Sequence, residues 1–419
     1  MNHKEILASL HISNDELRFI LAEFHNGKLN IINLETVSHD AINNRYIVSE
    51  SKIINAIKTI IKRNKQKLGI DIKRVLLSVP SDGFSRKSLK MQVRDNYKKE
   101  IVSVSEINAT FKDALKTQVE GDLVISNALL TRYNVDGIFL KKFDPSNPVG
   151  SLSIEVDLLC AHKEFIYSYV KCVELSGLEV IDISLDSYNA IKEAALLEQA
   201  RSNYILAISL RKDSTVFSVL NKGRIVDSSM LNEGIGKAIN DISRAFNLDY
   251  EIILKLMRYH VDISQTVYSD DPVYLWNSED KTHRLTEKEL ILMAKEQINE
   301  FVIKAVEYIE PILNLDDVSI MLLEEGAAIN GLDKFLQEKV NKTVNNYVPT
   351  TLGARDVNNT VCLGGFYSYK DRFAMDSSLY SSVDILEYDR ILGSKRKREE
   401  EISESFTGRF KNIFEKITK

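Results

Sequence analysis

The segment Ile6–Leu34, ILASLHISNDELRFILAEFHNGKLNIINL, decides the fold. Two apolar, strand-like runs flank the polar turn His11–Glu16, and Asn26-Gly27 is a type I′ hairpin turn that leads into a third strand. Apolar residues at helical spacing then predict a helix over Ser49–Leu68, and Val75–Val79 is a short buried strand. The chain therefore opens with a β-β-β-α unit.

The same order of elements recurs in the second half of the chain. Ile205–Leu210 and Val216–Leu220 are predicted strands around the turn Arg211–Ser214, and a strand at Arg224–Asp227 precedes a helix at Lys237–Phe246. A duplicated β-β-β-α unit with insertions is typical of the actin-like ATPase superfold, an α/β architecture in which the two turns face each other across a cleft. We therefore expect this fold class.

The composition excludes several classes of protein. With 419 residues, of which 44% are apolar and 27% charged, the chain has the profile of a globular protein with more than one domain. Its net charge of −5 gives no basic excess, so we expect no nucleic-acid partner. Cysteine and histidine spacings indicate neither disulfides nor a metal site. No apolar run reaches the ~20 residues of a membrane span, and no signal peptide is evident, which predicts a cytoplasmic chain.

Several motifs share their order and spacing with one protein family. Asn147–Gly150 reads N-P-V-G and is followed by VKCVELSGLEV at 170–180, similar to the family pattern N-P-V-G … V-K-x-V-E-x-x-G-L-x-V. Further matches are Y-N-V-D-G at Tyr133–Gly137, N-D-I at 240–242 and G-A-x-x-x-G-L at Gly326–Leu332. Over nearly the whole chain these motifs resemble FtsA, the actin-like adaptor of bacterial cell division.

The resemblance implies a division into subdomains. In the order of the family these are 1A at 1–79 and 165–200, an inserted α+β subdomain 1C at 80–164, 2A at 201–240 and 314–370, 2B at 241–313, a flexible linker at 371–404, and a membrane-targeting amphipathic helix at 405–419.

The phosphate-binding motifs depart from the family pattern. The first turn, L-D-I-G-T-S-K in the family, is LHISNDE at Leu10–Glu16, so that His11 replaces an aspartate and Ser13 a glycine. The second, D-I-G-G-G-T-x-D, is SLRKDSTV at Ser209–Val216, and the adenosine loop has Glu324-Glu325-Gly326 in place of three glycines. The degenerate nucleotide cleft thus comprises His11, Ser13, Asn14, Asp15, Ser209, Arg211, Lys212, Asp213, Ser214, Gly234, Glu324, Glu325 and Gly326.

These replacements disfavour a nucleotide. A carboxylate about 5 Å from a phosphate costs about 3 kcal/mol at an effective dielectric constant near 20, and each Cβ blocks the approach of backbone N–H groups. We therefore expect a pseudo-ATPase with no catalytic residues and at most weak ATP binding. Two interpretations of Arg211 and Lys212 remain. They could bind an anion without metal, with His11 facing them, or they could bridge a collapsed cleft.

The C-terminal segment has the pattern of an interfacial helix. Aromatic and aliphatic residues fall on one face at helical spacing, and cationic residues flank that face. The alternative is a helix docked on the protein's own surface. A single such helix binds lipid only marginally, so several copies would have to act together. The predicted membrane-binding residues are Phe406, Arg409, Phe410, Lys411, Ile413, Phe414, Lys416 and Ile417.

By resemblance, the chain is a peripheral membrane protein of the divisome that tethers filaments of the tubulin-like FtsZ to the cytoplasmic face of the cell membrane at the division site. The implied partners are the FtsZ C-terminal tail and membrane lipids, with self-association into protofilaments as a further interaction. The implied FtsZ contact on the helix Thr286–Ile309 comprises Lys295, Gln297, Asn299 and Glu300, and Gln297 stands where the family commonly has arginine.

Two other functions fit the same superfold. One is a catalytically active actin-like ATPase or kinase, and the other is a pilus-type scaffold protein, which would not need a terminal amphipathic helix. The single tryptophan, Trp276, is expected to anchor a loop near Asp270-Asp271-Pro272.

Overall fold

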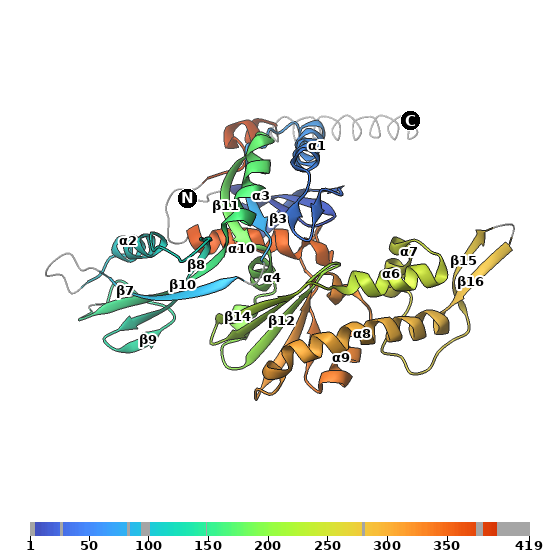
Figure 1. Ribbon diagram of the computed structural model, residues 1–419. Coiled ribbons are helices and arrows are strands. Elements are labelled where there is room, and N and C mark those ends of the chain that lie inside the picture. Colours follow the sequence, from blue (N-terminus) through green and yellow to red (C-terminus); the bar gives the residue numbers. More distant parts are fainter. Residues whose placement is uncertain are drawn as a thin grey trace, which may run out of the picture.

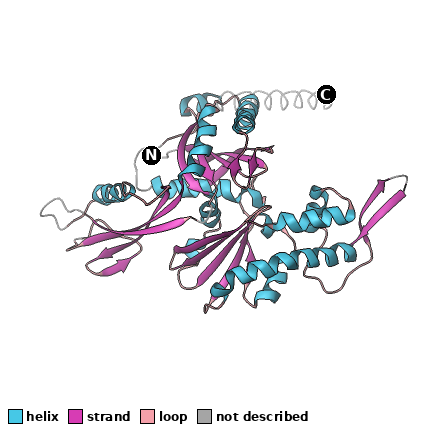
Figure 2. Ribbon diagram, viewed as in Figure 1, coloured by secondary structure: helices cyan, strands magenta, loops and turns pink. Residues whose placement is uncertain are grey.

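The computed structural model describes residues 5–25, 28–81, 84–93, 101–147, 149–278, 281–373 and 380–391. Two five-stranded sheets form the centres of two halves of the molecule, and a third, smaller sheet extends from the first half (Figures 1 and 2). The two large sheets have the same strand order and the same pattern of parallel and antiparallel pairs. This repetition confirms the predicted actin-like fold.

The first half is built on the sheet β11-β6-β1-β2-β3. Apolar side chains alternate along β1, so that Ile6, Ala8 and Leu10 face one core and Leu7 faces the other. Helices α1 and α3 cover the first face and α10 covers the second. The bounds are β1 Glu5–Ile12, β2 Glu16–His25, β3 Lys28–Ser38, β4 Ile42–Asn43, β5 Tyr46–Ile47, α1 Glu50–Leu68, β6 Arg74–Val79, α3 Lys163–Leu175, β11 Glu179–Leu185, α4 Asp186–Glu193 and α10 Thr360–Phe373.

The second half is built on the sheet β14-β13-β12-β17-β18, and its core packs against α6, α7, α8 and α9. A two-stranded hairpin, β15–β16, projects from the far end of this half (Figure 1). The bounds are α5 Leu196–Gln199, β12 Tyr204–Leu210, β13 Thr215–Asn221, β14 Arg224–Leu231, α6 Ile235–Phe246, α7 Tyr250–Tyr259, β15 Pro272–Ser278, β16 Lys281–Thr286, α8 Glu287–Leu313, β17 Val318–Leu323, η1 Glu324–Ala328, α9 Leu332–Val340, β18 Val344–Asn346 and η2 Val357–Asn359.

The inserted subdomain is a four-stranded sheet, β7-β10-β8-β9, with one helix packed on it. A capping box between Ser103 and Glu106 fixes the start of this helix. The segment therefore has the α+β character that the sequence predicts. The bounds are β7 Ser85–Gln92, α2 Val104–Leu115, β8 Leu123–Val135, β9 Ile138–Leu140 and β10 Leu152–His162.

Helices α4 and α10 cross closely between the two halves. The crossing requires a glycine, because a Cβ atom added to Gly364 would lie 1.8 Å from the carbonyl oxygen of Asn189. The Asn189 side chain donates to Ser78 Oγ at 2.8 Å and accepts a hydrogen bond from Ser368 Oγ at 2.6 Å. These buried bonds fix α4, whose first residue lines the cleft.

The structure corrects two local expectations. The first strand continues to Ile12, so His11 pairs with Arg18 in the sheet and is not part of a turn. The loop expected around Trp276 is a strand, because the indole stacks on His283 across the hairpin, with ring centroids 5.3 Å apart. Such a cross-strand pair stabilises a hairpin.

Part of the expected linker packs on the first half. Ser382 N–H donates to the Ile6 carbonyl at 2.8 Å, and Ser382 Oγ accepts a hydrogen bond from Ala8 N–H at 2.8 Å. Val383 and Tyr388 are buried in the core. The flexible linker predicted at 371–404 is therefore wrong for residues 380–391. The predicted turn at 26–27, Pro148 of the N-P-V-G motif and the helix at 405–419 lie outside the described residues.

Candidate functional site

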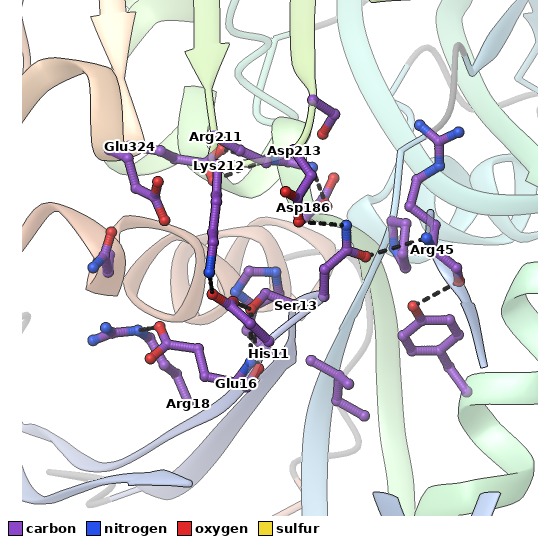
Figure 3. Close-up of a pocket in the computed structure, with 18 residues that line it drawn as sticks. His11, Ser13, Glu16, Arg18, Arg45, Asp186, Arg211, Lys212, Asp213 and Glu324 are labelled. Atoms are coloured by element: carbon purple, nitrogen blue, oxygen red, sulfur yellow. Dashed lines mark hydrogen bonds and ion pairs between the residues drawn. The ribbon is translucent and has the colours of Figure 1, made fainter. Parts of the chain in front are cut away.

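A cavity opens between the two halves where the β1–β2 and β12–β13 turns meet (Figure 3). The structure brings together most of the cleft residues that the sequence predicts. Three of them lie behind the wall: Ser209 is buried on β12, Gly234 precedes α6, and Gly326 packs against Leu210. The predicted residues that line the cavity are His11, Ser13, Asn14, Asp15, Arg211, Lys212, Asp213, Ser214, Glu324 and Glu325.

The guanidinium of Arg211 lies between two carboxylates at the centre of the site. Its Nη1 is 2.7 Å from Asp186 Oδ2, and its Nε is 2.9 Å from Glu324 Oε2. The side chains of Asp186 and Glu324 are only 3% and 7% exposed, which shields these charges from water. Arg211 therefore joins the second half of the molecule to α4 of the first.

Asp186 is the main site residue that the sequence did not reveal. It begins α4, where the helix dipole favours a negative charge, and its Oδ1 accepts hydrogen bonds from Ser81 N–H at 2.8 Å and Ser187 N–H at 2.6 Å. Burial opposes ionisation, but the charge of Arg211 and a hydrogen bond from the Ser81 hydroxyl hold the pKa of Asp186 below its ordinary value. Asp186 directly follows β11, and an acidic residue at such a strand end was the available signal.

Two further contacts cross the cleft beside Arg211. Lys212 Nζ reaches from the second half to Asp15 Oδ2 of the first at 2.9 Å. Asn14 Nδ2 donates to Asp213 Oδ2 at 3.2 Å. Burial disfavours the charge on Lys212, yet its bond to Asp15 raises the pKa of the ammonium group. The β1–β2 turn and the β12–β13 turn therefore contact each other directly.

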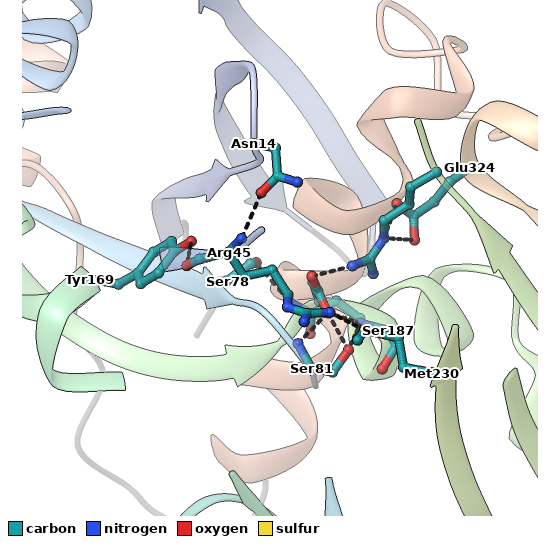
Figure 4. A network of polar contacts seen from close by, with 11 residues as sticks. Asn14, Arg45, Ser78, Ser81, Tyr169, Ser187, Met230 and Glu324 are labelled. Carbon is teal, nitrogen blue, oxygen red and sulfur yellow. Dashed lines mark hydrogen bonds and ion pairs between the residues drawn. The ribbon is translucent and has the colours of Figure 1, made fainter. Parts of the chain in front are cut away.

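Arg45 makes a fourth connection, from the short β4–β5 hairpin. It has the left-handed backbone angle φ of 71°, and its N–H donates to Asn14 Oδ1 at 3.1 Å. Its carbonyl accepts a hydrogen bond from the hydroxyl of Tyr169 at 2.9 Å (Figure 4). Its Nη2 donates to Asn232 Oδ1 of the second half at 3.0 Å. No sequence motif indicated that Arg45 or Tyr169 belongs to the site.

The backbone N–H groups at the start of α6 are already hydrogen-bonded within the protein. Free N–H groups at a helix N-terminus are a common phosphate-binding device. Here Ile235 N–H donates to the Arg211 carbonyl at 2.9 Å, and Gly236 N–H donates to the Lys212 carbonyl at 2.9 Å. A Cβ atom on Gly234 would lie 2.1 Å from the Arg211 carbonyl oxygen, so glycine permits this contact.

Two buried groups in the cleft have displaced pKa values. Burial, together with Arg211 and Arg18, lowers the pKa of His11 to about 4, although Asp186 acts in the opposite direction. Burial, reinforced by the charge of Asp15, raises the pKa of Glu325 to about 8. Both groups are therefore predominantly uncharged at neutral pH.

The space that remains is small. The cavity holds about 60 Å³ for water-sized occupants, enough for a few water molecules, whereas small-molecule pockets commonly span about 300–1,000 Å³. Within the described part of the chain, no cluster of three or more His, Cys, Asp or Glu side chains could hold a metal ion. The geometry favours a cleft bridged by its own side chains over an open anion site.

The predicted partner-binding residues lie elsewhere, on α8 of the second half. Lys295 Nζ donates to the carbonyl of Gln265 and to the hydroxyl of Tyr268, the latter at 3.2 Å. Glu300 is exposed, and Gln297 and Asn299 are half-buried. The helix therefore presents a mixed polar surface here, and none of these residues lines the cleft.

Solved structures define the class of the fold. The chain superposes on the PilM–PilN type IV pilus biogenesis complex with a TM-score of 0.56 and 12% identity, over 86% of this chain and 98% of that one. It superposes on the ethanolamine utilization protein EutJ from Carboxydothermus hydrogenoformans with a TM-score of 0.50 and 9% identity, over 87% and 89% of the two chains. This chain has the actin-like ATPase fold.

Sequence comparison finds similarity to one group of curated proteins. The chain is 23% identical to the cell division protein FtsA of Staphylococcus epidermidis over 354 residues, 83% of this chain and 75% of that protein. It is 21% identical to FtsA of Bacillus subtilis over 364 residues, 85% and 81% of the two chains. No protein-family model matches. The chain is a divergent relative of the FtsA cell-division proteins.

The Arg211 contacts predict a large effect on stability. In Arg211→Met, Asp186 and Glu324 would be left buried without their counter-charge, which should lower the free energy of unfolding by about 3–5 kcal/mol. Lys212→Met is the matched control. Because its pair with Asp15 is more exposed, it should cost less than about 1 kcal/mol. Urea denaturation measures both, and equal losses would contradict the assignment.

The raised pKa of Glu325 predicts that the stability of the protein depends on pH. Its pKa rises from 4.5 to about 8 on folding, so its contribution to stability is complete below the lower value and is lost as the pH rises through the upper one. Glu325→Gln should therefore flatten the loss of stability across this window. Melting temperatures measured through the window test this, with exposed Glu251→Gln as the control. Parallel curves for wild type and Glu325→Gln would refute the prediction.

Proposed function

We propose that the chain is an FtsA-type cell-division adaptor that ties FtsZ filaments to the cytoplasmic face of the membrane, and that its cleft no longer serves a nucleotide. Similarity to FtsA proteins over most of the chain supports the division role. The observation that carries the second part is the position of Arg211 between Asp186 and Glu324.

A nucleotide would have to compete with these internal contacts. A triphosphate in the cleft would either displace Arg211 or lie beside two buried carboxylates. Breaking a buried ion pair costs about 3–5 kcal/mol, which corresponds to a loss of roughly 10²–10⁴ in affinity. The N–H groups at the start of α6 are also engaged. Loss of Mg-ATP binding therefore follows from the proposal, as does the absence of turnover.

Binding of the FtsZ tail is assigned to α8 and the loop beside it. Lys295 lies over the ring of Tyr268, with its Nζ 5.2 Å from the ring centroid, and it holds the loop through its two hydrogen bonds. Charge reversal at Lys295 would remove a cation from this surface and release the loop. Both effects should weaken the binding of an acidic or carboxylate-bearing partner to this surface.

Attachment to lipid is assigned to residues 405–419, whose pattern is that of an interfacial helix. Among the described residues, no helix is long and apolar enough to cross a bilayer. Contact with the membrane would then be peripheral. Because one such helix holds weakly, several chains on one FtsZ filament would act together through effective concentration.

Co-sedimentation of FtsZ with anionic vesicles tests the two assignments separately. The full chain should carry FtsZ filaments into the vesicle pellet. Lys295→Glu should still pellet with vesicles but lose most of the FtsZ, whereas a chain ending at Glu404 should leave both proteins in the supernatant. Lys58→Glu, an exposed charge reversal on α1, is the matched control and should behave as wild type. Equal recruitment of FtsZ by all four proteins would refute the proposed function.

A further inference from the structure

A second pocket lies where the inserted subdomain and both halves of the molecule meet. Its walls come from α2 and β8 of the inserted subdomain, from α4 and α10, and from α5 and the β13–β14 turn. Its volume is about 310 Å³, which lies within the range of small-molecule pockets. Pockets of this size occur preferentially at domain interfaces. This junction pocket shares no lining residue with the cleft around Arg211.

The junction pocket has an excess of positive charge. Its lining includes four cations against two carboxylates, those of Glu198 and Asp371. Among the described residues, three of the cations make no ion pair and are exposed to solvent: Lys141, Arg201 and Lys222. Such an arrangement attracts an anion and leaves donors free to bind it.

The fourth cation is built into the wall. The side chain of Lys192 is only 9% exposed, and its Nζ lies 2.5 Å from Asp371 Oδ2 and 3.8 Å from Glu198 Oε1. Both carboxylates are themselves largely exposed, at 61% and 49%. Lys192 is thus a fixed positive charge whose partners can turn to solvent when a ligand anion approaches.

Beside three polar residues, Asn127, Thr131 and Ser368, the rest of the lining is mostly apolar. Phe111, Tyr188 and Leu197 are buried beneath the charged rim, and Leu129 and Leu130 of β8 complete the wall. An ion without an apolar part would leave this surface in contact with water. A ligand that combines a negative group with an apolar body would satisfy both the rim and the wall.

The junction pocket also lies beside a contact that couples the parts of the molecule. Arg224 of β14 binds Asp157 of the inserted subdomain with Nε 2.8 Å from Oδ2 and Nη2 2.5 Å from Oδ1. Figure 1 shows β14 beside the sheet of that subdomain. An occupant of the pocket would add a second connection across the same junction.

We propose that the junction pocket binds a small anionic molecule with an apolar body, and that this ligand fastens the inserted subdomain to both halves. The ligand is recognised by Lys192, Arg201 and Lys222 at the rim and by the apolar wall around Phe111. This site is independent of the cleft and of the proposed tethering of FtsZ.

Fluorescence titration with 8-anilinonaphthalene-1-sulfonate tests the proposal on the full chain, because this probe joins one sulfonate to an apolar ring system. Wild type should show one saturable site, and its melting temperature should rise with probe concentration. The double variant Arg201→Glu/Lys222→Glu reverses two exposed charges and should weaken binding at least tenfold. Ala128→Leu narrows the wall without a change of charge and should weaken it as well.

The matched control is Lys58→Glu/Lys62→Glu, the same change of charge on exposed positions of α1 outside the pocket. It should bind the probe as wild type does. The proposal is overturned if wild type shows no saturable binding, or if the rim and wall variants bind the probe as tightly as the control. FtsZ recruitment to vesicles is measured separately, so either proposal can fail alone.

Discussion

The guanidinium of Arg211 lies between two buried carboxylates, Asp186 from the start of α4 and Glu324 from the start of η1. It joins the β12–β13 turn to α4, and the contact between Lys212 and Asp15 crosses the cleft beside it. It also neutralises charge that would otherwise be buried at considerable cost. The halves are therefore connected without a ligand.

Further contacts of the cleft come from the backbone of the β12–β13 turn. The carbonyls of Arg211 and Lys212 engage the start of α6, and glycine at Gly234 lets them approach. His11 and Glu325 remain uncharged near this cluster, so they add no further repulsion at neutral pH. The proposed adaptor role fits such a cleft, since a tether needs a fixed arrangement of its binding surfaces rather than a cycle of hydrolysis.

The sequence predicted the fold, and most of the predicted cleft residues line one cavity, because turns at the ends of predicted strands must meet once the β-β-β-α unit is duplicated. It did not predict Asp186 or Arg45, whose partners lie far away in the chain and are chosen by tertiary packing. The hairpin around Trp276 was not predicted from the sequence, because cross-strand stacking, not periodicity, stabilises it. The packing of residues 380–391 was not predicted, because it depends on backbone hydrogen bonds to β1 that leave no pattern in the sequence.

The most direct test of this account is isothermal titration calorimetry of the full chain with ATP and Mg²⁺. The internal pairing of Arg211 predicts no saturable heat of binding up to millimolar nucleotide. A saturable isotherm with a micromolar dissociation constant would contradict it, since it would show that nucleotide displaces the contacts between Arg211, Asp186 and Glu324 at little cost.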